Sequence, residues 1–254
     1  MTLISTQAKL LNAQTPCEHC PFHKCESLRR FTPAELEFIR GFKRGELVLP
    51  RGTCIYSEGV EHQHLYTILS GWAFRFKTLE DGRRQILNFA LPGDLVGLQN
   101  AMFNKMRHSV EALTEVRLCI FDRKDVWKLY RDHPELAFDL TWIAAREEAM
   151  LHEHLVTTGR RSGIERVGYV LLHLYVRLEQ LGLVQENSAV FPMTQTHLAD
   201  ALGLSIVHTN KTIQKLTRLG LMEWRGGVLR LIDRARLTQI AFFDVDENQV
   251  RPFI

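Results

Sequence analysis

The spacing of hydrophobic and polar residues changes character twice along this chain. Residues 1–30 show no sustained periodicity and are expected to form an irregular arm. A short helix is predicted from Thr32, because threonine is a favourable N-cap and Pro33 suits the first helical position. From about residue 45 to 122, short β-rich runs alternate with glycine, and Asp81–Gly82 is typical of a tight hairpin turn. Many short strands without intervening helices predict a sandwich or barrel-like roll.

The period becomes helical after Asp122. A long helix is predicted from Pro134 to about Thr157, followed by a glycine-containing break and a second helix over residues 164–181. The long helix has a main stripe of residues at spacings of four and three: Leu136, Leu140, Ile143, Glu147, Met150 and His154. A second run lies beside it and consists of Ala137, Ala144, Leu151 and Leu155. Such a stripe suits either a partner helix or the helix's own roll, and periodicity alone leaves both open.

Residues 194–221 have the pattern of two helices joined by a tight turn. Gly203 supplies the turn, where a left-handed backbone suits glycine. Ser205 is the expected N-cap of the second helix, and Ala199 is small where the two helices must cross. The buried face of the second helix is expected to consist of Ile206, Thr209, Ile213 and Leu216.

The opposite face of the second helix is polar and cationic and has no acid: Val207, His208, Asn210, Lys211, Gln214, Lys215 and Arg218. In DNA-binding proteins a helix N-terminus, Lys and Arg engage phosphates, while short polar side chains reach base edges in the major groove. A solvated basic face is the alternative interpretation. Residues 223–231 predict two short strands around Gly226–Gly227, the wing of a winged helix-turn-helix. The candidate DNA-binding residues are Thr194, Gln195, Ser205, Val207, His208, Asn210, Lys211, Lys215 and Arg218.

Composition narrows the class of protein. The chain has 254 residues, is 45% hydrophobic and has a formal net charge of +3, so a basic DNA-binding surface has to be local. No run of about 18 apolar residues is present, and the first fifteen residues do not resemble a signal peptide, which predicts a cytoplasmic protein with no membrane partner. The expected fold class is α+β, with an arm over 1–30, a roll over 31–132, a long helix over 133–158, a winged helix-turn-helix over 159–240 and a tail over 241–254.

This order of elements resembles the Crp/Fnr superfamily of bacterial transcription regulators. The resemblance covers roughly residues 30 to 235, and it is carried by Gly52–Gly59, Leu65–Gly71, Leu91–Gly97 and Leu202–Ser205. It implies a cyclic-nucleotide-binding-like sensory β-roll, a homodimer joined through the long helix, and a C-terminal winged helix-turn-helix. It also implies palindromic double-stranded DNA and RNA polymerase as partners, with half-sites about 34 Å apart.

The resemblance also bears on the ligand of the roll. Members that bind a cyclic nucleotide use a Glu for the ribose and an Arg–Ser pair for the phosphate, and the aligned positions here are Leu98, His108 and Ser109. A ribose hydroxyl needs an acceptor, and a cyclic phosphate is best held by a guanidinium. A cyclic nucleotide is therefore not expected to bind.

Cysteine is concentrated in the arm. Cys17, Cys20 and Cys25 lie within nine residues, whereas Cys54 and Cys119 stand alone. In a reducing cytoplasm such a cluster indicates metal or redox chemistry rather than structural disulfides.

The oxygen-responsive Fnr branch of the family binds a [4Fe–4S] cluster with three arm cysteines and one roll cysteine, so the resemblance implies a regulator that responds to oxygen or redox state. The resemblance therefore implies Cys17, Cys20, Cys25 and Cys119 as its ligands, with Cys54 as a small strand residue. Zinc is an alternative, because tetrahedral zinc accepts both thiolate and imidazole, and so are redox-active thiols with no cofactor. The zinc ligands would be Cys17, Cys20, Cys25 and either His19 or His23.

Two further inferences concern other chemistry and DNA specificity. His62 and His64 have a spacing found in cupin-like metal enzymes, but the acid expected a few residues later is missing, so a polar turn is favoured over an enzyme.

Fnr-type recognition helices read DNA with Glu, Ser and Arg, and the aligned residues here are Val207, Asn210 and Lys211. The chain is therefore expected to prefer a different half-site.

Overall fold

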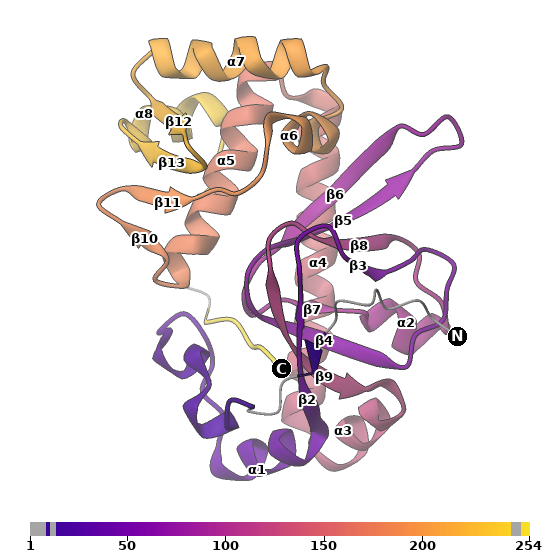
Figure 1. Cartoon of the computed structure of the whole chain (residues 1–254). Coiled ribbons are helices and arrows are strands. Elements are labelled where there is room, and N and C mark those ends of the chain that lie inside the picture. The colour runs from indigo at the N-terminus through magenta and orange to yellow at the C-terminus, as the bar shows by residue number, and fades with distance from the viewer. Residues whose placement is uncertain (1–8, 11–13, 245–249) are drawn as a thin grey trace. The chain divides into compact units, whose positions relative to one another are not determined.

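The computed structural model describes residues 9–10, 14–244 and 250–254 (Figure 1). Parts of the predicted arm (1–8 and 11–13) and of the predicted tail (245–249) lie outside these residues. The chain divides into two compact units: Met1–Lys77, Asn88–Glu148 and Val250–Ile254 form the first, and Thr78–Leu87 and Ala149–Gln249 form the second. The C-terminal segment thus belongs to the first unit, together with the arm and most of the roll.

The roll is built from two antiparallel sheets, as the sequence predicted. In the described residues their strand orders are β1-β2-β9-β4-β7 and β3-β8-β5-β6. The strands are β1 (Lys9–Leu10), β2 (Lys43–Leu49), β3 (Cys54–Tyr56), β4 (His64–Ser70), β5 (Ala73–Thr78), β6 (Arg84–Ala90), β7 (Leu95–Val96), β8 (Ser109–Ala112) and β9 (Val116–Asp122). Strand β2 begins with charged residues and ends with the hydrophobic Leu47, Val48 and Leu49, of which Leu47 and Leu49 are buried. The core between the sheets includes Tyr56, Ile68, Val110, Val116 and Leu118.

Two turns of the roll have a backbone conformation that favours glycine. Gly71 joins β4 to β5 with φ of +85°, and a Cβ there would lie 2.1 Å from the carbonyl oxygen of Glu115. Gly82 closes the β5–β6 hairpin, also with φ of +85°. Glycine adopts such conformations without a steric penalty, so the glycine-punctuated pattern is a genuine sign of these turns.

Short helical segments surround the roll in the first unit. Helix α1 (Pro33–Phe42) begins with the predicted cap: Thr32 accepts from the Glu35 amide at 3.3 Å, and Glu35 accepts from the Thr32 amide at 2.7 Å. The arm, predicted to be irregular, contains two short 3₁₀ helices. The remaining helical segments of this unit are η1 (Cys17–His19), η2 (Pro21–Lys24), α2 (Leu98–Phe103), η3 (Arg123–Asp125), α3 (Val126–Asp132) and the first part of α4 (Pro134–Arg160).

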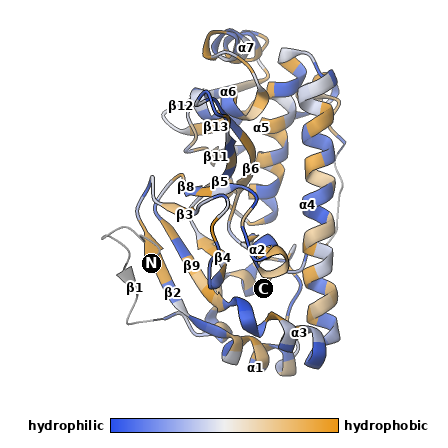
Figure 2. Cartoon of the chain, turned by 90° about the vertical axis from the view of Figure 1, so that its right-hand side faces the viewer, coloured by the Kyte–Doolittle hydropathy of each residue, from blue (hydrophilic) through white to orange (hydrophobic). Residues whose placement is uncertain are grey.

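The first part of the main stripe of α4 packs on its own roll. Leu136 and Leu140 are fully or almost fully buried. Glu147, in the same stripe, forms an ion pair with Arg75 of β5. Ile143, Met150 and His154 of that stripe are half-buried, and a partner helix for them stays a prediction. Other hydrophobic residues of α4 are exposed, among them Phe138 (69%) and Leu155 (70%). Figure 2 shows both hydrophobic and hydrophilic residues along the length of α4.

The second unit is a winged helix-turn-helix. Helix α5 packs on α7 and α8, and the described strands form one sheet in the order β10-β11-β13-β12. The β12–β13 hairpin turns at Gly226 and Gly227, both with positive φ, and this is the predicted wing. The elements are α5 (Gly163–Gln180), β10 (Val184–Gln185), β11 (Ser188–Val190), α6 (Gln195–Leu202), α7 (Ile206–Arg218), β12 (Met222–Arg225), β13 (Val228–Leu231) and α8 (Arg234–Ala241). The α+β fold class is confirmed.

Candidate functional site

Both helices of the helix-turn-helix have side-chain N-caps, and the cap at Ser205 is the one that the sequence predicted. Helix α6 starts at Thr194, whose side chain accepts from the His197 amide at 3.3 Å. The helix ends at Gly203 with φ of +62°. Ser205 then caps α7 by accepting from the His208 amide at 3.2 Å. Thr194 and Ser205 therefore hold the two helices in place through their side chains.

Helix α7 presents a buried stripe and an exposed cationic face. The buried residues are Thr209, Thr212, Ile213 and Leu216. The expectation that Ile206 is buried is wrong: this first helical residue precedes the packed stretch and is 52% exposed, whereas Thr212 is buried. The exposed residues are Val207, His208, Lys211, Gln214, Lys215 and Arg218, as predicted. This face provides the positive charge and helix N-terminus that phosphates require.

Three amide side chains are connected to one another across α6 and α7. Asn210, which is half-buried, donates to Gln195 of α6 at 2.8 Å and accepts from Gln214 at 2.9 Å. His208 lies beside the start of α5, since a Cβ on Gly163 would be 2.4 Å from its Nε2 atom. Sequence reasoning missed this because the partners of Asn210 and His208 come from other helices.

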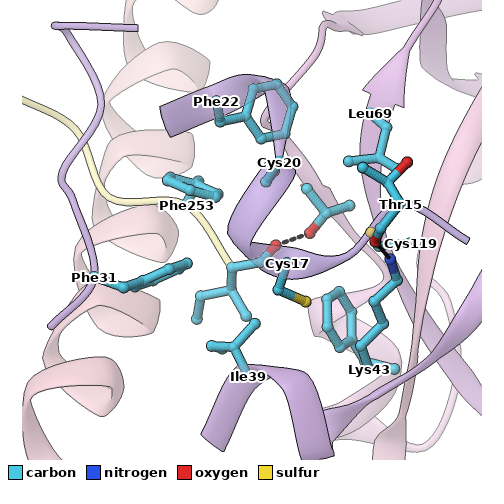
Figure 3. A pocket seen from close by; sticks show the side chains of 13 residues that line it. Thr15, Cys17, Cys20, Phe22, Phe31, Ile39, Lys43, Leu69, Cys119 and Phe253 are labelled. Atoms are coloured by element: carbon cyan, nitrogen blue, oxygen red, sulfur yellow. Dashed lines mark hydrogen bonds between the residues drawn. The ribbon is translucent and has the colours of Figure 1, made fainter. Parts of the chain in front are cut away.

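Three of the predicted ligand cysteines share one cavity. Cys17 and Cys20 come from the arm and Cys119 from the middle of β9, where it pairs with Glu46 of β2 and Thr67 of β4. The cavity measures about 30 Å³, enough for at least one water molecule. Figure 3 shows the three residues around the same space. Its other lining residues are Thr15, Phe22, Phe31, Ile39, Lys43, Thr67, Leu69, Phe121, Phe253 and Ile254.

Burial keeps these thiols protonated at neutral pH. It raises the pKa of Cys119 to about 12, and it also raises the pKa of Cys17 and of Cys20. Lys43 opposes these shifts, but its ammonium group already donates to Glu46 at 2.6 Å and to the Thr15 carbonyl at 2.7 Å. The cavity is therefore lined by neutral sulfhydryls with one neutralised cation beside them.

The remaining cysteines lie elsewhere. Cys25 does not line the cavity; burial raises its pKa, and the nearby Arg251 lowers it. Cys54 is exposed and starts β3, consistent with a small strand residue. Within the described part of the chain, no group of three or more His, Cys, Asp and Glu side chains is arranged to hold a metal ion. The four predicted ligands are thus not brought together as one set.

The positions aligned with a cyclic-nucleotide site are occupied by protein contacts. His108 is only 8% exposed, and Ser109 accepts from the Glu58 amide at 3.0 Å. Close to His108, the buried Arg75 forms an ion pair with Glu147 and also donates to the Leu95 carbonyl at 2.9 Å. These contacts engage the strongest anion-binding group near the aligned site.

The histidine pair of the cupin-like alternative is engaged in local contacts. His62 accepts from the Ser57 amide at 3.4 Å and packs edge-on against the Tyr56 ring. His64 lies 3.1 Å from a carboxylate oxygen of Asp122. The pair therefore behaves as a polar turn.

Fold and candidate site together define a DNA-binding regulator: a sensory roll, a long helix and a winged helix-turn-helix with a cationic second helix. Comparison with known families gives the same result. The cyclic nucleotide-binding domain matches residues 46–133, and the Crp-like helix-turn-helix domain matches residues 165–240.

Individual relatives agree with the domain matches. The chain is 31% identical over 226 residues to the nitrogen fixation regulation protein FixK of Bradyrhizobium diazoefficiens, covering 89% of this chain and 93% of that protein. It is 30% identical, with the same coverage, to the transcriptional activatory protein AadR of Rhodopseudomonas palustris. The solved structure of FixK2 from Bradyrhizobium japonicum superposes with a TM-score of 0.70 at 27% identity, over 77% of this chain and 96% of that one. The chain belongs to the Crp/Fnr family of transcription regulators; it is not an enzyme.

No helix among the described residues is both long and apolar enough to span a bilayer.

We predict that His108 makes the roll acid-sensitive. Burial, then Arg75 and Lys77, lower the pKa of His108 from 6.5 to about 4. Because the folded-state pKa is depressed, the stabilisation is present above pH 6.5 and is lost as the pH falls towards 4, on the order of 3 kcal/mol in total. His108→Gln should flatten this part of the stability–pH profile, measured by urea unfolding, whereas substituting the exposed His152 with Gln should not. Parallel profiles for His108→Gln and the unsubstituted protein would contradict the prediction.

We predict that Lys215 and Arg218 contact DNA phosphates. Lys215→Ala or Arg218→Ala should weaken binding to all sequences alike, and each lost contact should reduce the slope of log K against log salt by about 0.9. Fluorescence anisotropy over a salt series measures this slope. Arg131→Ala, which removes an exposed arginine of α3, is the control that should leave the slope unchanged. A slope unaffected by either α7 substitution would remove that residue from the DNA contacts.

Proposed function

We propose that this regulator binds palindromic DNA as a homodimer and that its DNA affinity responds to the state of Cys17, Cys20 and Cys119. The observation that carries the proposal is that arm and roll cysteines meet at one buried cavity. The cationic face of α7 supports the DNA half, since it carries Lys and Arg and no acid. Contact with RNA polymerase is inferred from the family alone.

The exposed side of α4 supports the dimer. Leu151 and Leu155 are one helical turn apart and are 44% and 70% exposed, and Phe138 and Val156 add apolar surface on this helix. Exposed hydrophobic groups that recur along one helix are costly in water and mark an interface. A second copy of α4 is the partner that places two α7 helices on a palindromic site.

The signal is proposed to enter through thiol state rather than a cyclic nucleotide. The ion pair of Arg75 with Glu147 and the burial of His108 at the aligned phosphate position support this. A [4Fe–4S] cluster would need four thiolates, and Cys25 does not line the cavity that Cys17, Cys20 and Cys119 share. This arrangement gathers neither the four cluster ligands nor the four zinc ligands. Both cofactors stay predictions, alongside unligated redox-active thiols.

We predict that Leu155→Asp produces a monomer. A buried, unpaired carboxylate at each side of a two-fold interface is strongly unfavourable, so the dissociation constant should rise by at least about a hundredfold. Analytical ultracentrifugation gives the constant. Leu79→Asp, at an exposed hairpin position, adds the same charge and should leave the dimer intact. If Leu155→Asp and Leu79→Asp have equal dissociation constants, Leu155 is not part of the dimer interface.

We predict that Cys119 is needed for the response and Cys54 is not. DNA affinity should differ by at least about threefold between anaerobic and air-exposed protein, because a change at the cavity alters the packing of arm on roll. Cys119→Ser should abolish this difference, and Cys54→Ser should preserve it. An undiminished response in Cys119→Ser would refute the assigned site. Iron, sulfide and zinc analysis of anaerobically reconstituted protein separates the three chemistries: a brown protein indicates the cluster, bound zinc the zinc site, and neither indicates thiols.

A further inference from the structure

The C-terminal segment Val250–Ile254, here called the tail, is bound along the arm. The Arg251 amide donates to the Ser27 carbonyl at 2.9 Å, and the Arg29 amide donates to the Arg251 carbonyl at 2.9 Å. These two bonds form a parallel β-bridge between Leu28 and Arg251. The tail thus adds a backbone pairing to the segment that directly follows Cys25.

The side chain of Arg251 enters a pocket made by the roll. One guanidinium nitrogen is 2.9 Å from a carboxylate oxygen of Asp94, and another donates to the Pro92 carbonyl at 3.0 Å. The two side chains are 7% and 3% exposed. Gly93 lies between Pro92 and Asp94 in the sequence, and a Cβ on it would be 2.9 Å from the Arg251 guanidinium. Breaking a buried pair leaves an uncompensated charge, so this contact is strongly favoured once formed.

The last two residues of the tail line the cysteine cavity. Phe253 is 4% exposed, and its ring centroid is 4.8 Å from that of Phe31 and 5.2 Å from that of Phe22. Ile254 is equally buried and accepts a hydrogen bond from the Thr67 hydroxyl through its backbone oxygen. Figure 3 shows Phe253 beside the cavity together with Cys17 and Cys20. Any group that enlarges or fills this cavity has to displace tail atoms.

The tail is also the end of a tether. Helix α8 of the winged unit ends at Ala241, and the tail follows it in the sequence but belongs to the first unit. The chain therefore links the winged unit to the segment that lines the cysteine cavity.

We propose that the tail is an intramolecular clamp that closes the cysteine cavity and couples it to the DNA-binding unit. When docked, it holds the arm through the β-bridge and limits the access of reagents to Cys20 and Cys119. Modification or ligation of the cavity thiols competes with Phe253 and Ile254 and so favours release. Closure of the cavity does not depend on which cofactor or reagent acts there, whereas the coupling to DNA rests on the proposed function.

Closure is tested by thiol accessibility in the full-length protein. Arg251→Ala and Phe253→Ala should each raise the rate at which N-ethylmaleimide modifies Cys119 and Cys20 by at least about tenfold, because local opening then costs less. Peptide mass spectrometry follows each cysteine separately, and the exposed Cys54 is the internal reference. Arg234→Ala removes an exposed ion pair between Arg234 of α8 and Glu179 of α5. It is the matched control and should leave all labelling rates unchanged.

Hydrogen exchange separates clamp release from general unfolding. In both tail variants the Arg29 amide should lose protection while the amides of β9 keep theirs. Unchanged labelling rates of Cys119 and Cys20, or loss of protection throughout the roll, would overturn the clamp.

Coupling is tested in a Cys54→Ser background by measuring DNA affinity before and after modification with N-ethylmaleimide. Modification should change the affinity by at least about threefold when the tail is intact, and Arg251→Ala should remove most of that change, because linkage requires the docked tail. Equal changes with and without Arg251 would overturn the coupling. Failure of the unmodified protein to bind any DNA would instead refute the proposed function and leave closure standing on its own measurement.

Discussion

The carboxylate of Asp94 joins the segments on which the sensory unit depends. It follows the Pro92–Gly93 turn before β7 and accepts from the Leu91 amide at 2.7 Å, which fixes the loop. Its other oxygen pairs with Arg251 of the tail and lies 3.9 Å from Arg146 of α4. A buried carboxylate needs such partners, because desolvation without them would drive it to the neutral form. Loop, long helix and tail are therefore held at one point, and the arm is held through the tail.

The winged unit could be predicted closely because its signals are local. The predicted cap at Ser205 and the predicted turn at Gly203 depend on residues only a few positions away, and both are confirmed. The orientation of α4 could not be predicted, since two apolar stripes compete and period alone does not say which one meets the roll. Arg75 decides it, by pairing with Glu147 across a separation of 72 residues.

The cysteine site could be predicted only in part, because some of its contacts join residues that are far apart in the sequence. Spacing identified Cys17 and Cys20, and the family resemblance added Cys119, which the structure places at the same cavity. The exclusion of Cys25 and the presence of the tail depend on contacts such as Thr67 with Ile254, which are 187 residues apart. No periodicity or motif carries that information, because an arginine and a phenylalanine near a chain's end look like ordinary surface residues until their partners are known.

The amide chain from Gln195 through Asn210 to Gln214 has a consequence for the thermodynamics of recognition. Each of these side chains would lose rotational freedom on meeting a base edge, and that loss opposes binding. Because the three amides already restrain one another in the free protein, part of the ordering cost is met during folding. On the proposed function, DNA selectivity depends on α6 and α7 together, because Gln195 of α6 restrains Asn210 of α7 through a hydrogen bond.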